Sequence, residues 1–186
     1  MKMKFHEGSN FFYYASWDFW FNVKFKPFCF NNDFNFKRYF IAMRILQISG
    51  SDTGGGAERV ALDLHREYLK QGHDATLLVC TMKSTIPGVS GLGNGNNLEW
   101  KIINLLLRKV AYYTGNQTGF KILFDRWFRR NQTTWDIIHC HNLHGGYFPI
   151  EYLKILKKLS PVVITLHDEW LYTGHCSYTL DCERWR

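Results

Sequence analysis

Short apolar runs alternate with amphipathic stretches along the chain from residue 44 onward. Residues 44–49 (RILQIS) form a run that is typical of a parallel strand buried on both faces. The apolar positions of residues 57–68 recur at helical spacing, and Gly72 stands where a left-handed C-cap belongs. Because residues 75–80 are a second apolar run, this part of the chain predicts a β-α-β unit with a right-handed crossover.

The same alternation continues toward the carboxyl end. We expect a mobile surface loop over residues 83–97, which are rich in Gly and Asn. The later elements are expected as helices over 98–113, 120–130 and 150–159, and as strands over 136–141 and 161–166. On the first of these helices, one side is expected to carry Trp100, Ile103, Leu107 and Ala111. The pattern predicts an α/β fold with a doubly wound parallel sheet, which is Rossmann-like.

Residues 1–42 differ from the rest of the chain. They are packed with Phe, Tyr and Trp, show no steady period, and contain no Leu. We expect a poorly structured aromatic extension followed by one domain over residues 43–186. The extension is either upstream sequence translated ahead of a natural start at Met43, or an aromatic segment that lies on a membrane surface.

Composition limits the classes of partner. The 186 residues carry a net charge of +7, which suits an anionic partner such as a phosphate-bearing ligand, a membrane surface or nucleic acid. The basic residues are scattered, so we expect no nucleic-acid partner. Five cysteines without a recognisable leader favour a reducing compartment, and we expect a cytoplasmic protein, with peripheral association at the inner face of the membrane left open.

Gly54-Gly55-Gly56 separates the first strand from the first helix. Glycine amides and a helix N-terminus at this position suit an anion, and a simple tight turn is the alternative. The loop matches neither the P-loop nor the dinucleotide fingerprint.

Polar residues also follow the third expected strand. We expect His139 to pack beneath the edge of the sheet and His141 to reach the ligand crevice, with Asn142 beside it. The pair Gly145-Gly146 then permits a close approach or an abrupt change of direction. A zinc site at His139 and His141 would lack two further ligands, so we expect no metal here.

Thr165, His167 and Asp168 end the fourth expected strand. Three neighbouring parallel strands that all end in Gly, His, Asn, Thr or Asp offer hydrogen bonds to a polar ligand. Hydrolase chemistry is less favoured, because the sequence contains no G-x-S-x-G elbow. Cys176 and Cys182 could be half of a zinc knuckle, a disulfide or unrelated thiols.

Three segments together resemble family 4 glycosyltransferases, most closely those of the colanic-acid and exopolysaccharide type. They are residues 48–59 (ISGSDTGGGAER), 136–146 (DIIHCHNLHGG) and 165–185 (TLHDEWLYTGHCSYTLDCERW). The resemblance covers nearly everything after Ala42, and its third segment is far more specific than the glycine triplet.

The resemblance implies a GT-B fold, in which two Rossmann-like domains face a cleft, and retaining transfer without a metal or other cofactor. It implies that Gly55 and Gly56 approach the donor phosphates and the acceptor, and that His141 is the active-site histidine. The residues that correspond to the cleft-lining strand end are Thr165, His167 and Asp168.

In this family a carboxy-terminal domain holds the donor nucleotide, and it would lie beyond Arg186. The resemblance therefore implies an acceptor-side domain, truncated before the donor domain and nearly inactive alone. The complete enzyme would move a sugar from a nucleotide sugar to a polysaccharide or lipid-linked acceptor. The alternatives are a non-catalytic carbohydrate- or anion-binding module, or half of a split enzyme. A nucleotide-binding oxidoreductase is a weaker alternative, because the dinucleotide fingerprint is absent.

Overall fold

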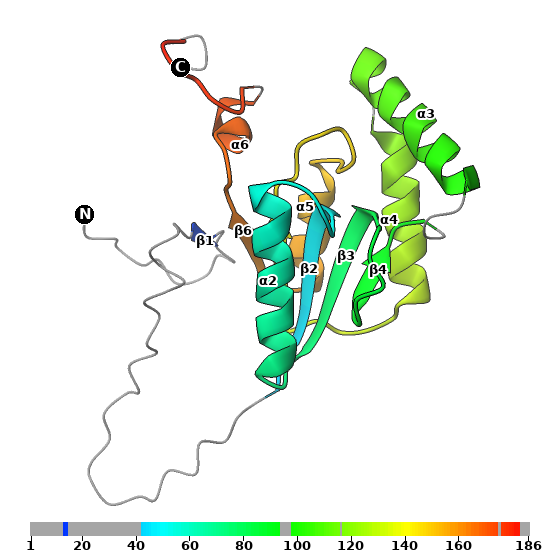
Figure 1. Ribbon diagram of the computed structural model, residues 1–186. Coiled ribbons are helices and arrows are strands. Elements are labelled where there is room, and N and C mark those ends of the chain that lie inside the picture. Colours follow the sequence, from blue (N-terminus) through cyan, green and yellow to red (C-terminus); the bar gives the residue numbers. More distant parts are fainter. Residues whose placement is uncertain (1–12, 15–41, 94–97, 116, 175, 183–186) are drawn as a thin grey trace, which may run out of the picture.

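The computed structural model describes residues 13–14, 42–93, 98–115, 117–174 and 176–182 (Figure 1). These residues form a six-stranded sheet in the order β1-β6-β5-β2-β3-β4, in which every neighbouring pair is parallel. The strands are β1 (Tyr13–Tyr14), β2 (Arg44–Ser51), β3 (Asp74–Thr81), β4 (Val89–Gly91), β5 (Ile137–His141) and β6 (Val162–Thr165). The helices are α2 (Gly56–Lys70), α3 (Leu98–Thr114), α4 (Thr118–Arg130), α5 (Tyr152–Leu159) and α6 (Trp170–Thr173). The predicted α/β fold with a parallel, Rossmann-like sheet is confirmed.

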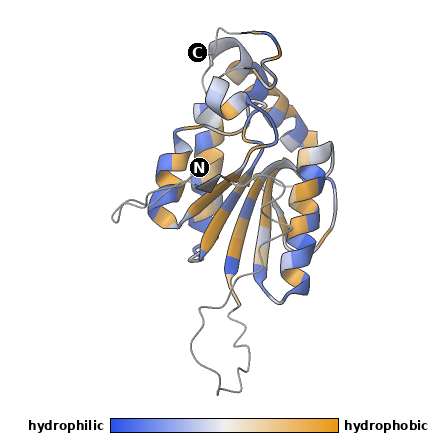
Figure 2. Ribbon diagram, turned by 90° about the vertical axis from the view of Figure 1, so that its left-hand side faces the viewer, coloured by the Kyte–Doolittle hydropathy of each residue, from blue (hydrophilic) through white to orange (hydrophobic). Residues whose placement is uncertain are grey.

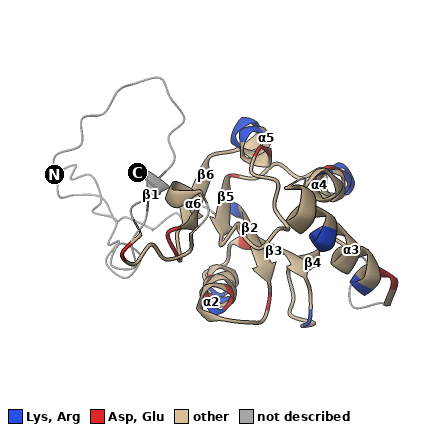
Figure 3. Cartoon of the chain, turned by 90° about the horizontal axis from the view of Figure 1, so that it is seen from above, with Lys and Arg blue, Asp and Glu red and all other residues tan. Residues whose placement is uncertain are grey.

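Helices cover both faces of the sheet. Viewed from above, α2 lies on one side, α4 and α5 lie on the other, and α3 stands at the end near β4 (Figure 3). The strands are predominantly apolar (Figure 2), and Leu46, Ile48, Leu77 and Leu78 have no exposed surface. Burial on both faces explains why these strands read as nearly continuous apolar runs in the sequence.

Strand β2 lies at the centre of the arrangement, between β3 and β5. Ile45 aligns with Ala75 of β3 and with Ile137 of β5, and His141 of β5 aligns with Thr165 of β6. Since all these strands are parallel, the carboxyl ends of β2, β5 and β6 meet at one edge of the sheet. The predicted convergence of three strand ends is therefore confirmed.

Several predicted boundaries need correction. The predicted loop over residues 83–97 contains strand β4, which pairs with β3. The amide of Leu77 hydrogen bonds to the loop, and the amide of Leu92 hydrogen bonds to β3. Helix α5 begins two residues later than predicted, at Tyr152. On α3, Ile103 is 46% exposed and the buried face instead includes Asn104.

The aromatic extension lies almost entirely outside the described residues. Tyr13–Tyr14 are described, and as β1 they pair with Val163 and Ile164 of β6. Among the helices of the described segments, none is both long enough and apolar enough to cross a membrane. The division of the chain into residues 1–42 and residues 43–186 stays a prediction.

Candidate functional site

The turn after β2 brings glycine backbone to the carboxyl edge of the sheet. Gly55 is the N-cap of α2, and Gly56 is its first residue. The amide of Arg59 is the donor of the first helical hydrogen bond, to the carbonyl of Gly55 at 3.1 Å. Amides of the first turn that precede Arg59 have no partner inside the helix, so they offer donors and partial positive charge to a ligand.

Glu58 occupies the space in front of this turn. Its carboxylate lies beside Gly54 and Gly55, within 3.5 Å of the position that a β-carbon at either glycine would take. The same carboxylate interacts electrostatically with His167 and Tyr147. The glycine turn and the β6 end are therefore close enough to share one electrostatic environment.

His139 and His141 lie on the same face of β5. Their ring centroids are 4.0 Å apart, because side chains two residues apart in a strand point to the same side. Their side chains are 1% and 0% exposed. The expected packing of His139 is confirmed, whereas the expectation that His141 reaches an open crevice is wrong.

A chain of hydrogen bonds runs from β2 through His141 to the end of β6. The Gln47 Nε2 amide donates to the carbonyl of Ala61 at 3.1 Å and lies 3.3 Å from His141 Nε2. An amide nitrogen only donates, so His141 Nε2 accepts and its ring proton is on Nδ1. His141 Nδ1 in turn lies 3.3 Å from His167 Nε2, which must accept this proton. Neutral His167 then carries its own proton on Nδ1.

Burial keeps the three rings neutral near pH 7. It lowers the pKa of His139 to about 3, with a further contribution from the charge of His167. Burial, together with repulsion from His139 and His167, holds the pKa of His141 well below its usual value. Burial also lowers the pKa of His167, although Glu58 and Asp168 act in the opposite direction. These rings are suited to hydrogen bonding rather than to carrying charge.

Thr165 supports this group from inside the sheet. Its hydroxyl lies 2.7 Å from His139 Nε2, and the side chain is buried. On the other side of the ring, the Tyr68 hydroxyl lies 3.5 Å from His139 Nδ1. The structure thus places the predicted site residue Thr165 against His139, beneath the edge of the sheet.

Asp168 holds a small polar cluster beside His167. One carboxylate oxygen pairs with His144 Nε2, and the other accepts the amide of Trp170 at 3.0 Å. Trp170 packs against the His144 ring, with centroids 5.9 Å apart. A narrow pocket lies here, and it is lined by Asn142, Leu143, His144, Ile164, Thr165, Leu166, His167, Asp168, Trp170 and Leu171.

A turn with three positive-φ residues follows β5. Asn142 has a φ of 47°, and Gly145 and Gly146 have φ values of 91° and 72°. Asn tolerates the left-handed region better than most residues, and Gly adopts it without a steric penalty. Of the two roles expected of the glycine pair, a close approach or an abrupt change of direction, these backbone angles agree with the change of direction. The side-chain oxygen of Asn142 is buried without a hydrogen-bond partner, so it is an acceptor still to be satisfied.

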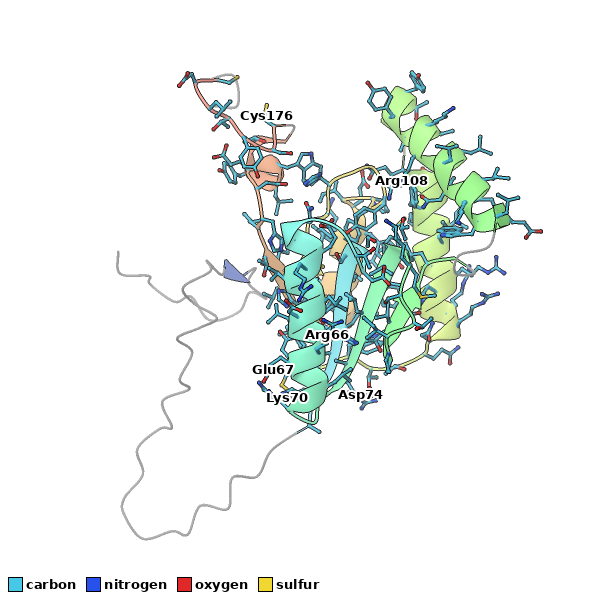
Figure 4. All side chains as sticks on the ribbon, in the orientation of Figure 1. Arg66, Glu67, Lys70, Asp74, Arg108 and Cys176 are labelled. Carbon is cyan, nitrogen blue, oxygen red and sulfur yellow. The ribbon has the colours of Figure 1, made fainter. Side chains whose placement is uncertain are left out.

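Two side chains fix this turn, the buried Tyr147 and the partly exposed Arg108. The Tyr147 hydroxyl donates to the carbonyl of Asn142 at 3.2 Å. Arg108 points from α3 toward the turn (Figure 4) and donates to the carbonyl of Gly145 at 2.6 Å. The same guanidinium donates to Asn104 at 3.0 Å, so α3 is tied to the site.

Asp52 ties the glycine turn to the loop after β3. Its carboxylate accepts the amide of Lys83 at 2.9 Å and the amide of Ser84 at 2.6 Å. Burial acts to raise the pKa of Asp52, but the hydrogen bonds from Ser84 and Lys83 outweigh it and the pKa is lowered. The carboxylate is therefore stabilised in its charged form.

Cys176 lies beyond α6 (Figure 4). Cys182 lies in the same last described segment, and the two are not joined to each other by a disulfide. The segment is held by Glu169, whose carboxylate accepts the amide of Thr179 at 2.6 Å. Within the ranges that the structure describes, no three His, Cys, Asp or Glu side chains are grouped to hold a metal ion. The absence of a required metal or cofactor stays a prediction.

Several residues of this site were not predicted from the sequence, among them Gln47, Glu58, His144 and Tyr147. Gln47 carried a usable signal, because a fully buried amide within an apolar strand needs a polar partner. Glu58 is acidic and stands in the first turn of α2, where the helix dipole alone explains it, so the sequence does not mark it as part of a site. The partners of His144 and Tyr147 depend on how the turn after β5 folds back, which no local pattern reveals.

Comparison with known proteins agrees with this arrangement. The profile of Glycosyltransferase Family 4 matches residues 54–185, a span that begins in the glycine turn and contains both histidine strand ends. A protein of Escherichia coli (strain K12), WcaC, which bears the name of a colanic acid biosynthesis glycosyl transferase, is 28% identical over 153 residues. That alignment covers 77% of this chain and 38% of the relative, so the chain spans less than half of the relative's length. The match covers most of the chain, and the chain therefore belongs to Glycosyltransferase Family 4.

Proposed function

We propose that the carboxyl edge of this sheet forms the acceptor-side wall of a sugar-transfer site. In the complete enzyme, a sugar moves with retention from a nucleotide-sugar donor to a polysaccharide or lipid-linked acceptor. Family membership supports the transfer of a sugar. The observation that carries the proposal is the contact between His141 and His167 at the ends of two neighbouring strands. His141 also contacts Gln47 of β2, and His167 interacts electrostatically with Glu58, which lies beside the glycine turn.

Each group has a proposed role. The first-turn amides of α2, beginning at Gly55 and Gly56, donate to phosphate oxygens of the donor, because a helix N-terminus favours negative charge. His167 donates from Nδ1 to a sugar or acceptor oxygen. His141 acts as a positioning residue, because it is buried and fixes the tautomer of His167. Asn142 and Asp168 line the neighbouring pocket for sugar hydroxyls.

The donor nucleotide is proposed to be held by a second domain that faces this edge. Preorganised donors around a diphosphate leaving group are the main source of rate acceleration in such transfer, and one wall supplies only part of them. We therefore expect the isolated chain to transfer sugar very slowly. No metal is assigned to the step.

The test is transfer of a labelled sugar in the enzyme reconstituted with its donor-binding half. Gly55→Val and His167→Ala are each expected to lower kcat by about 100-fold or more, since the valine side chain would block the approach of a phosphate to the first-turn amides and alanine would remove the imidazole donor. His73→Ala is the matched control, because His73 lies at the amino end of β3 and contacts the amide of Met43. Equal losses in all three variants would contradict the proposal.

A non-catalytic carbohydrate- or anion-binding module is the second candidate. The unsatisfied side-chain oxygen of Asn142 and the narrow pocket beside it also suit a sugar that is bound and not transformed. Such a module would keep its ligand affinity in His141→Ala and would show no transfer when the donor half is supplied.

A further inference from the structure

A second pocket lies at the amino ends of the strands, on the edge of the sheet opposite the proposed transfer site. Its volume is about 280 Å³, whereas the narrow pocket beside Asp168 has about 10 Å³. Small-molecule sites in proteins begin at roughly 300 Å³, so the second pocket has the size of a site for one small ligand.

Three strands and one helix contribute to this pocket. Asp74 and Val89 are the first residues of β3 and β4, Asn131 is the C-cap of α4, and Trp135 precedes β5. Figure 4 shows Asp74 far from Arg108, which contacts the turn after β5. Strand β3 has eight residues, and a rise of about 3.3 Å per residue separates the pocket from the carboxyl edge by a distance on the order of 20 Å. The pocket is therefore distinct from the transfer site.

Two tryptophans form part of the pocket wall. The rings of Trp127 and Trp135 are nearly parallel, with an angle of 19° between their planes and centroids 6.4 Å apart. The indole Nε1 of Trp127 donates to Ser90 Oγ at 2.9 Å. Trp135 is 9% exposed, and its indole Nε1 is buried without a hydrogen-bond partner. Buried donors without an acceptor are rare in folded proteins, so this indole is a donor still to be satisfied beside the pocket.

The polar lining favours a neutral ligand that is rich in hydroxyl groups. It consists of the hydroxyls of Thr76, Ser90 and Thr133, the amide of Asn131 and the carboxylate of Asp74. Among the described residues that line the pocket, there is no Lys or Arg. An anionic ligand would therefore meet a carboxylate without a compensating cation, although the whole chain carries a net charge of +7. Hydroxyls and amides both donate and accept hydrogen bonds, as the hydroxyls of a sugar do.

We propose that this pocket binds one sugar ring of a neutral saccharide. A sugar ring presents C–H groups that pack against aromatic surface and hydroxyls that hydrogen bond to polar side chains, and the pocket offers both kinds of surface. The carboxylate of Asp74 accepts hydrogen bonds from the sugar hydroxyls, and the hydroxyl of Thr133 donates or accepts. A sugar bound here leaves the carboxyl edge free. The inference goes beyond the proposed sugar transfer and does not depend on it.

The experiment is titration of the ¹⁵N-labelled full chain with glucose, galactose and N-acetylglucosamine, followed through the indole N–H resonances. The resonances of Trp127 and Trp135 are assigned from Trp127→Phe and Trp135→Phe, and at least one of the three sugars is expected to shift them. Glucuronic acid, which is the anionic counterpart of glucose, and inorganic phosphate should leave them in place, because each brings negative charge to Asp74. Gly55→Val should bind the same sugar as the unaltered chain does, which separates this pocket from the transfer site.

Asp74→Ala combined with Thr133→Ala removes two of the proposed contacts and should weaken sugar binding about tenfold. Asp63→Ala combined with Thr134→Ala is the matched control, because both residues are exposed and neither lines the pocket. Thermal unfolding of both double variants checks that the fold is retained. The proposal is overturned if none of the three sugars shifts either indole, or if the two double variants bind equally. It is also overturned if glucuronic acid or phosphate shifts the indoles as strongly as the sugar, or if Gly55→Val abolishes the response.

Discussion

His141 Nδ1 lies 3.3 Å from His167 Nε2 across the ends of two neighbouring strands. The buried amide of Gln47 contacts the other nitrogen of His141, also at 3.3 Å. A residue of β2 therefore sets which nitrogen of a β6-end histidine carries the proton. The hydrogen bonds therefore run from the buried amide of Gln47, through His141, to the half-buried ring of His167.

The first prediction concerns the tautomer of His141. We expect its proton on Nδ1, and ¹⁵N NMR of the imidazole nitrogens measures this directly. Gln47→Glu replaces the donor with an acceptor, so the proton should move to Nε2. Gln71→Glu at the exposed end of α2 is the control and should change nothing. An Nε2 proton in the unaltered chain would contradict the hydrogen-bond assignment.

The second prediction concerns stability and pH. Burial lowers the pKa of His139 to about 3, so the unfolded state binds a proton at a higher pH than the folded state does. Its contribution to stability is complete above the unfolded value of about 6.5 and is lost as the pH falls toward about 3. The free energy of unfolding should therefore fall by up to about 1.4 kcal/mol per pH unit for this group.

Chemical denaturation at several pH values between these limits tests this. His139→Gln removes the titrating group and should flatten the dependence, although it also lowers stability at neutral pH. A slope identical to that of the unaltered chain would show that His139 is not the group responsible.

The third prediction concerns Asp52. Asp52→Ala leaves the amides of Lys83 and Ser84 without their acceptor, and we expect a loss of about 1–3 kcal/mol of unfolding free energy. Asp63→Ala is the control. Asp63 makes only exposed ion pairs within α2, so its loss should cost about 0.5 kcal/mol or less. Because the pKa of Asp52 is lowered, its contribution should persist above the unfolded value and disappear as the pH falls through the folded pKa.

The fourth prediction concerns the turn after β5. Arg108→Ala removes the donor to the carbonyl of Gly145, so the turn should open more readily. Hydrogen exchange at the amides of Gly145 and Gly146 should become faster, while exchange in β2 should not change. Unaltered exchange at both glycines would show that Tyr147 alone fixes the turn.

The spacing of apolar residues along the sequence predicts much of this fold. The run from Arg44 to Cys80 predicted a strand, a glycine turn, a helix and a second strand, and all four are present. The strand ends were also predictable, because parallel strands joined by helices place their carboxyl ends at one edge. Strand β4 was not predictable from the sequence. Val89–Gly91 is short, lies in a glycine-rich stretch, and is recognised as a strand only through its pairing with β3.

Other features depend on contacts that are distant in the sequence. Asp52 meets Lys83 and Ser84 across a separation of more than 30 residues, and no local pattern marks that contact. The burial of His141 was predictable in part, because His139 and His141 must share a face. The sequence grouped Ile103 with Trp100 and Ala111 on one side of α3, yet Ile103 is 46% exposed while the other two are buried. Apolar residues also occupy the outward side of this helix, so apolar character alone did not decide burial.

One titration tests most directly whether the three strand ends form a single ligand site. The ¹⁵N-labelled chain is titrated with pyrophosphate, with a nucleotide sugar and with an oligosaccharide, and the amide and imidazole resonances are followed. We predict that pyrophosphate and the nucleotide sugar shift the Gly55 and Gly56 amides together with the His167 imidazole, and that Gly55→Val abolishes both responses. Shifts induced by pyrophosphate or the nucleotide sugar that map to another surface, or that move Gly55 without His167, would contradict the account.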